Sequence, residues 1–202
     1  MKIGNVQINN AKAHDGYTDE AGHIWGKKKY AEDEISGTIG RSLLGISRLL
    51  LLDLNNSAFF IFRKREDLKH LRKEGYLLEN LVELPFDGAK NRVVFLVDTD
   101  VGQERFLLDT GASYSVIRPT FISEEEREAM RENKLTISLP KFVIAGHDFG
   151  EMDFYAYEFS EKFEGVDGVL GMDFCKKHVI YLDFKENKAL IGPVEKVHPI
   201  SK

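Results

Sequence analysis

An aspartate set between two apolar segments is the feature that most constrains this chain. Residues 106–113 read FLLDTGAS, and apolar residues resume at 116–117. A carboxylate at the end of an apolar strand is costly to bury unless it is hydrogen-bonded or shares a proton. The small residues Gly111 and Ala112 allow backbone amide groups to approach it. The pattern predicts a buried strand, a tight turn that carries Asp109, and a second buried strand.

A second element, ending in glycine, follows farther along the chain. Residues 166–171 read VDGVLG, and they precede a short mixed segment, MDFCKKH, and an apolar run, VIYLDF, at 179–184. Asp-Thr-Gly alone is a weak signal, because ordinary turns also favour Asp and Gly. The second element, in this order, makes the combined pattern more specific than the first element alone.

Together these elements resemble the aspartic proteases, most closely the single-lobe, retropepsin-like group. The resemblance covers about residues 77–192 and implies a mostly β fold, a closed β-barrel lobe of the acid-protease type. It implies that Asp109 is catalytic and that Thr110 ties two lobes together by hydrogen bonds beneath the site. It also implies that Gly111 lets the loop approach its partner, and that residues 169–171 form a hydrophobic-hydrophobic-glycine element.

The N-terminal part of the chain is similar to the closing half of such a lobe. Residues 35–40 read ISGTIG, against VDGVLG at 166–171, and residues 49–54 read LLLLDL, against VIYLDF at 179–184. Each apolar run is followed by a turn and a further strand-like segment. Chance similarity between short apolar strands is the alternative interpretation. We predict a half-lobe repeat at 1–64, a linker helix at 65–76 and a complete retropepsin-like lobe at 77–202.

Aspartic proteolysis requires two carboxylates that share one proton, so that one acts as a base toward water and the other as an acid. The chain supplies one candidate, Asp109. Asp98 and Asp100 belong to VDTDVG, which we interpret as a hairpin turn, and Asp167 precedes the apolar pair, where we expect a turn or surface role. We therefore predict an endopeptidase that is active as a symmetric homodimer, with Asp109 from each copy.

Two departures from the family pattern favour other functions. Retropepsin-like proteases close a glycine-rich hairpin, the flap, over the substrate, yet no glycine occurs here between Gly111 and Gly146. Residues 123–133, SEEEREAMREN, instead predict a capped helix. The N-terminal half-lobe also competes for the surface of a homodimer. Two alternatives stay open: a catalytically inactive binding or assembly module with the same fold, and a fragment of a two-lobe aspartic protease.

Composition bears mainly on partners and compartment. A net charge of -5 and a pI near 5.7 argue against nucleic acid as a partner. The resemblance to aspartic proteases implies a peptide or protein substrate. The start of the chain shows no signal-peptide pattern, and the most apolar run, 43–54, contains charges; we expect no membrane segment and a cytoplasmic location. Cys175 is expected to be a small buried hydrophobe. The six histidines show no metal spacing, and we expect neither a metal nor a cofactor.

Overall fold

The computed structural model of the chain describes residues 2–3, 6–7, 17–18, 24–25, 49–56, 58–62, 69–73, 75–89, 92–121 and 135–197. Residues 1–46 form one compact unit and residues 47–202 form another. The described part of the first unit consists of two antiparallel pairs of two-residue strands. These pairs are β1 (Lys2–Ile3) with β2 (Val6–Gln7), and β3 (Tyr17–Thr18) with β4 (Ile24–Trp25).

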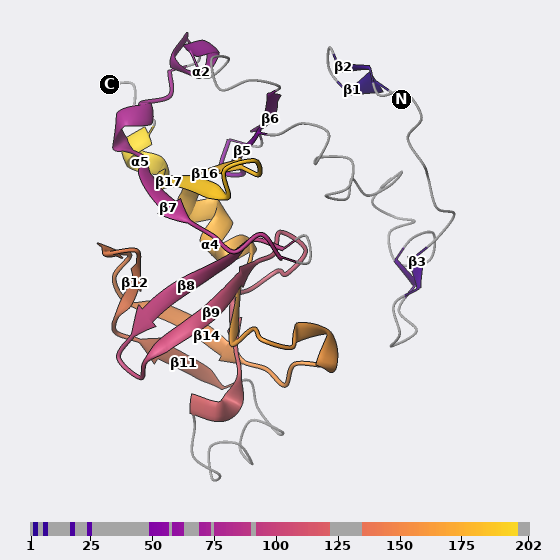
Figure 1. Ribbon diagram of the computed structural model, residues 1–202, viewed down its shortest axis with the longest axis vertical. Coiled ribbons are helices and arrows are strands. Elements are labelled where there is room, and N and C mark those ends of the chain that lie inside the picture. The colour runs from indigo at the N-terminus through magenta and orange to yellow at the C-terminus, as the bar shows by residue number, and fades with distance from the viewer. Residues whose placement is uncertain are drawn as a thin grey trace. The chain divides into compact units, whose positions relative to one another are not determined.

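In the second unit, an eight-stranded sheet carries the Asp109 segment (Figure 1). Its core is aromatic: the rings of Phe106, Phe142 and Phe154 are fully buried, with centroids 5.0–5.7 Å apart. In sheet order the strands are β11 (Thr136–Leu139), β14 (Met152–Ala156), β10 (Val116–Ile117), β15 (Gly168–Leu170), β9 (Gln103–Leu108), β8 (Val94–Thr99), β12 (Phe142–Ile144) and β13 (His147–Asp148).

Chain order and sheet order differ at β9 and β10. These strands follow each other in the sequence, but β15 lies between them, parallel to β9 and antiparallel to β10. The loop at 109–115 must therefore cross the end of β15. The expected fold requires the two sequence elements to lie side by side, and the pairing of Leu108 with Leu170 confirms this. The expectation of a mostly β lobe of the acid-protease type is confirmed.

The same unit contains a second sheet, of five strands (Figure 1). The short helix α4 (Met172–Lys177) contacts β15 of the first sheet and two strands of the second, and so joins them. On one face of the second sheet, Leu71 and Val197 from two further helices pack against Leu51 and Tyr181. In sheet order the strands are β6 (Ala58–Phe62), β5 (Leu49–Asp53), β16 (His178–Asp183), β17 (Lys188–Pro193) and β7 (Val82–Pro85).

The remaining described helices are one turn or little more. They are α2 (Lys69–Lys73), α5 (Val194–Val197) and the 3-10 turns η2 (Leu78–Asn80), η4 (Pro119–Phe121) and η5 (Glu161–Phe163). The glycine end expected for the linker helix is confirmed after α2. Gly75 has a φ of +90°, and the N–H groups of Gly75 and Tyr76 donate to the carbonyls of Arg72 and Leu71, the two bonds of a Schellman turn.

Most predicted elements in the described residues are confirmed. The apolar runs at 49–54 and 179–184 form strands β5 and β16, and the short segment after Gly171 forms α4. Asp98 and Asp100 flank the hairpin between β8 and β9, as expected. The predicted helix at 123–133 and the ISGTIG segment at 35–40 lie outside the described residues.

A buried carboxylate closes the β5–β6 hairpin. Asp53 is fully buried, and its Oδ1 accepts the backbone N–H of Asn56 at 3.2 Å. Its Oδ2 accepts the Tyr76 hydroxyl at 2.9 Å, which fastens the segment after α2 to the sheet. A buried charge needs such donors, because an unsatisfied carboxylate loses its hydration without compensation.

We predict that Tyr76→Phe lowers the free energy of unfolding by about 1.5–3 kcal/mol, because it removes a buried hydrogen bond to a charged group. Urea unfolding followed by fluorescence measures the loss. Tyr157→Phe is the matched control and should leave stability unchanged, since Tyr157 is 56% exposed. Equal stability of the Tyr76→Phe variant and the wild type would show that the Asp53–Tyr76 bond does not hold the sheet.

Candidate functional site

Asp109 sits where β9 ends and the crossing loop begins. Its backbone N–H donates to the carbonyl of Leu170 at 3.0 Å, which ties the loop to the end of β15. Its Oδ1 accepts the N–H of Gly111 at 2.8 Å, so the turn itself holds the carboxylate in place. The Asp109 side chain is partly buried, whereas Thr110 and Gly111 are exposed. The three predicted site residues thus lie together on one loop; their catalytic roles stay predictions.

Gly171 leaves the space through which this loop crosses. A Cβ on Gly171 would lie 2.5 Å from the carbonyl carbon and oxygen of Tyr114 and 2.9 Å from the oxygen of Ala112. These neighbours are backbone atoms, so they cannot turn aside as a flexible side chain would. The N–H of Met172 donates to the same Ala112 oxygen at 2.8 Å. Any residue larger than glycine at position 171 would displace the Asp109 loop.

Sequence reasoning missed a buried network that closes the loop. The hydroxyl of Ser115, which is 1% exposed, donates to Asp173 Oδ1 at 2.7 Å and accepts the N–H of Gly171 at 3.0 Å. The backbone N–H of Ser115 donates to Asp173 Oδ2 at 2.9 Å. Asp173 lies in the first turn of α4, so these hydrogen bonds attach the end of the crossing loop at Ser115 to the helix. Residues 115 and 173 are too far apart in the sequence for any local pattern to reveal the pair.

Two other carboxylates considered from the sequence, those of Asp98 and Asp167, accept hydrogen bonds within the fold. Asp98 Oδ1 accepts the side-chain amide of Gln103 across the β8–β9 hairpin. Asp167 Oδ2 accepts the N–H of Arg105 at 2.9 Å, and burial together with Asp167 raises the pKa of the neighbouring Glu104. Among the described residues, no second carboxyl group hydrogen-bonds to Asp109.

The surface beside Asp109 is open. Ser113 and Tyr114 follow it on the crossing loop and are exposed, Tyr114 to 54%. The Tyr114 ring packs edge-on against Tyr155 of β14, with centroids 5.3 Å apart. The loop thus offers an exposed face made of one carboxylate, small residues and an aromatic ring.

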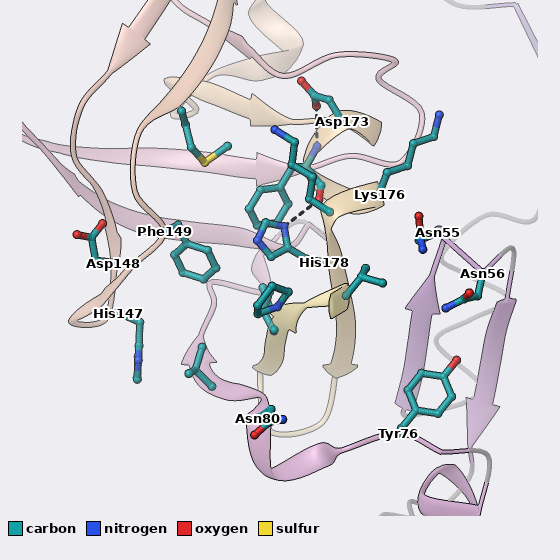
Figure 2. A pocket seen from close by; sticks show the side chains of 18 of the residues that line it. Asn55, Asn56, Tyr76, Asn80, His147, Asp148, Phe149, Asp173, Lys176 and His178 are labelled. Carbon is teal, nitrogen blue, oxygen red and sulfur yellow. Dashed lines mark hydrogen bonds between the residues drawn. The ribbon is translucent and has the colours of Figure 1, made fainter. Parts of the chain in front are cut away.

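A wide groove of about 1580 Å³ lies elsewhere on this unit (Figure 2). His178 stands in its wall, stacked on Phe174 at 4.3 Å between ring centroids, with Nδ1 2.9 Å from the Phe174 carbonyl oxygen. Asp173 and Lys176 of α4 also line it, but Asp109 does not. Asp173 thus both lines the groove and bonds Ser115 at the end of the crossing loop.

Two features are absent from the described residues. In them, no three His, Cys, Asp or Glu side chains converge on a point that could hold a metal ion. No helix in this part of the chain is long and apolar enough to cross a membrane.

Comparisons with known proteins give likenesses of fold at low sequence identity. No protein-family model and no curated protein matches the chain. Similar solved structures include a retropepsin-like aspartic protease from Rickettsia conorii, with 17% identity, a TM-score of 0.35, and coverage of 55% of this chain and 90% of that one. The aspartic proteinase from Irpex lacteus has 14% identity and a TM-score of 0.43, covering 76% and 58%.

A third similar structure is conglutin gamma, a basic 7S globulin from lupine seeds. It has 10% identity and a TM-score of 0.45, covering 75% of this chain and 52% of that chain. The chain thus spans little more than half the length of the Irpex and lupine proteins. The likeness is to the fold of aspartic proteases.

We predict that Ser115→Ala lowers the free energy of unfolding by about 1–3 kcal/mol, because it leaves the buried Gly171 N–H and an Asp173 oxygen without their partner. Urea unfolding measures the loss, and hydrogen exchange should become faster at residues 109–115. Ser113→Ala, two residues away and exposed, is the matched control and should change neither. If both variants matched the wild type, the network would not be what anchors the loop.

Cys175 gives a second test of the same region. It is buried in α4, and burial, followed by the charges of Asp173 and Asp109, raises the pKa of its thiol to about 12. Because the thiolate is the nucleophile, we predict that iodoacetamide alkylates the folded protein far more slowly than the urea-unfolded protein at the same pH. Mass spectrometry measures both rates. Equal rates would mean that α4 does not stay packed against the loop.

Proposed function

We propose that this chain supplies one half of the active site of an aspartic endopeptidase, with Asp109 as one of two paired carboxylates. The observation that carries the proposal is the geometry of the Asp109 loop. The Gly111 N–H donates to the carboxylate and the Leu170 carbonyl accepts the backbone N–H of Asp109, yet the side chain stays partly exposed on an open face. A second Asp-Thr-Gly loop from outside residues 1–202 would complete the pair, since this motif occurs once within them.

The chemistry follows from two carboxyl groups about 3 Å apart, which cannot both ionise and hold one proton between them. The ionised group accepts a proton from a water molecule, whose oxygen attacks the carbonyl carbon of the peptide. The protonated group gives its proton to the carbonyl oxygen, and a tetrahedral diol forms. When the carbon–nitrogen bond breaks, the leaving nitrogen takes the proton from the pair and a hydroxyl of the diol gives its own proton back to the pair, so an acid and an amine are released and the pair again holds one proton. In this scheme Asp109 is one of the two groups, and a peptide or protein is the substrate.

A binding module of the same fold is the second candidate. The groove at His178 favours it, because this large cavity is not lined by Asp109. A binding module would keep the lobe and its loop without cleaving anything. The two candidates differ in whether Asp109 matters to a measured activity.

We predict that Asp109→Asn abolishes cleavage and leaves the fold intact, because the amide keeps the shape of the side chain but cannot act as a base. The assay follows digestion of a panel of unfolded proteins at several pH values and at low and high protein concentration. Cleavage should be fastest at acidic to near-neutral pH, where the pair holds one proton, and pepstatin-like hydroxyl compounds should inhibit it.

The matched control is Asp98→Asn, which changes the carboxylate of the other Asp-Thr dipeptide, in the β8–β9 hairpin, and should leave cleavage unchanged. If the homodimer expected from the sequence is the active form, the rate should rise as the square of the concentration while dimers are rare. Equal cleavage by the wild type and Asp109→Asn would remove Asp109 from the mechanism. No cleavage by an assembly that holds two facing Asp-Thr-Gly loops would favour the binding module.

A further inference from the structure

Two carboxyl groups that the proposed reaction does not use meet where β15 begins. Glu104 lies on β9, and Asp167 comes directly before β15. The two side chains are hydrogen-bonded to each other. An ionised carboxylate has no proton to donate, so two carboxyl groups form such a bond only when one of them is protonated. The contact between Glu104 and Asp167 therefore holds one proton while it is formed.

Backbone hydrogen bonds hold the two residues close together. The N–H of Asp167 donates to the carbonyl of Arg105 at 2.8 Å, and the N–H of Arg105 donates to Asp167 Oδ2 at 2.9 Å. Both members of the pair are half-buried, and Glu104 lies on the same face of β9 as the fully buried Phe106. Burial, followed by the charge of Asp167 and the hydrogen bond with it, raises the pKa of Glu104.

The charged side chains around the pair bind other groups. The guanidinium group of Arg105 donates to Asp87 Oδ2 and to a backbone carbonyl of the loop before β15, each at 2.8 Å. The guanidinium group of Arg118, directly after β10, donates to two further carbonyls of this loop. Other charged groups on the adjacent segments are Asp98 of β8, which accepts the Gln103 amide, and the exposed Glu161 and Glu164 of the same loop. The charge that acts on Glu104 is that of Asp167, so a proton bound by the pair is what relieves their repulsion.

The position of the pair connects it to the strand that supports the Asp109 loop. Residues 168–170 of β15 pair with residues 106–108 of β9, so the pair lies at the end of this ladder where β15 begins. At the other end, the Leu170 carbonyl accepts the N–H of Asp109 at 3.0 Å. Making or breaking the carboxyl contact therefore acts on the strand to which the Asp109 loop is bonded.

We propose that Glu104 and Asp167 form a proton-controlled latch that fastens the start of β15 to β9. While the pair holds one proton, the hydrogen bond between the two carboxyl groups keeps the latch closed. When both groups are ionised, this bond is lost, the two negative charges repel each other, and the start of β15 separates from β9 more often. The latch does not depend on the proposed function, because it acts on the fold whether or not the protein cleaves peptides.

Opening of the latch should increase as the pH rises. The closed latch binds its proton more tightly than the open one, in which Glu104 titrates near its ordinary pKa of 4.5. The proton therefore stabilises the closed latch fully below pH 4.5, and this stabilisation is lost as the pH rises through the raised pKa of the folded form. Between these two values the opening equilibrium increases by up to about tenfold per pH unit, because opening releases one proton.

The first measurement is amide hydrogen exchange of the full chain, followed by NMR at the N–H groups of Arg105 and Asp167. Rates are taken at several pH values above and below 4.5 and divided by those of an unstructured peptide of the same sequence. In the wild type the corrected rates should rise with pH and then level off. Glu104→Gln should remove this rise, because its side-chain amide donates to Asp167 at every pH. Glu164→Gln, in the same segment and exposed, is the matched control and should keep the pH dependence of the wild type.

The second measurement is the titration of the Glu104 carboxyl carbon by NMR, which reports the proton directly. In the wild type Glu104 should titrate above its ordinary pKa of 4.5, and Asp167→Asn should lower this pKa, because asparagine carries no charge and donates to the ionised Glu104. Both results together support the latch. It is overturned if Glu104 titrates at its ordinary value, if the corrected exchange rates of the wild type do not change with pH, or if their rise survives in Glu104→Gln.

Discussion

The crossing of the loop at 109–115 over the end of β15 is the constraint on which the rest of the structure depends. Because β15 lies between β9 and β10, the chain must pass Gly171 at a distance that admits no side chain. Backbone atoms hold Asp109 in the crossing. The N–H of Asp109 donates to the carbonyl of Leu170, and its carboxylate accepts the N–H of Gly111 in the same loop. The helix α4 begins directly after Gly171, and its Asp173 holds Ser115 at the other end of the crossing. The Asp109 loop, Gly171 and α4 are thus held in place by the same close packing.

This steric origin explains why sequence analysis found the loop. A tight turn between buried strands and a glycine beneath it leave local traces, and Asp109 and Gly171 sit in recognisable segments. The pair that anchors the loop, Ser115 and Asp173, leaves no such local pattern. Ser113 and Ser115 look alike in the sequence, and only the fold distinguishes the exposed hydroxyl of Ser113 from that of Ser115, which is 1% exposed. Burial of a single polar group depends on residues 58 positions away in the chain, and periodicity carries no information over that span.

The β5–β6 hairpin shows a second limit of prediction from local sequence patterns. The sequence predicted strands at 49–54 and a half-lobe at 1–64, and a half-lobe cannot bury its own core. The structure resolves this by placing β5 in the same sheet as β16, where Leu49 and Leu51 pack with Val179 and Tyr181. The apolar run at 49–54 predicted the strand, but the choice of its partner depends on which edge is free when the sheet forms. The domain boundary drawn at residue 64 stays a prediction.

The partial exposure of the Asp109 carboxylate has a physical reason. A lone carboxylate is cheapest to keep when water reaches it, and Asp109 retains partial exposure while its turn supplies one N–H donor. Bringing a second carboxylate beside it removes water from both and makes two negative charges meet, which is unfavourable unless the pair binds one proton. In the active site that we propose, formation of such a pair would therefore take up a proton. The proton that the proposed cleavage needs would then be acquired in the step that brings the two carboxyl groups together.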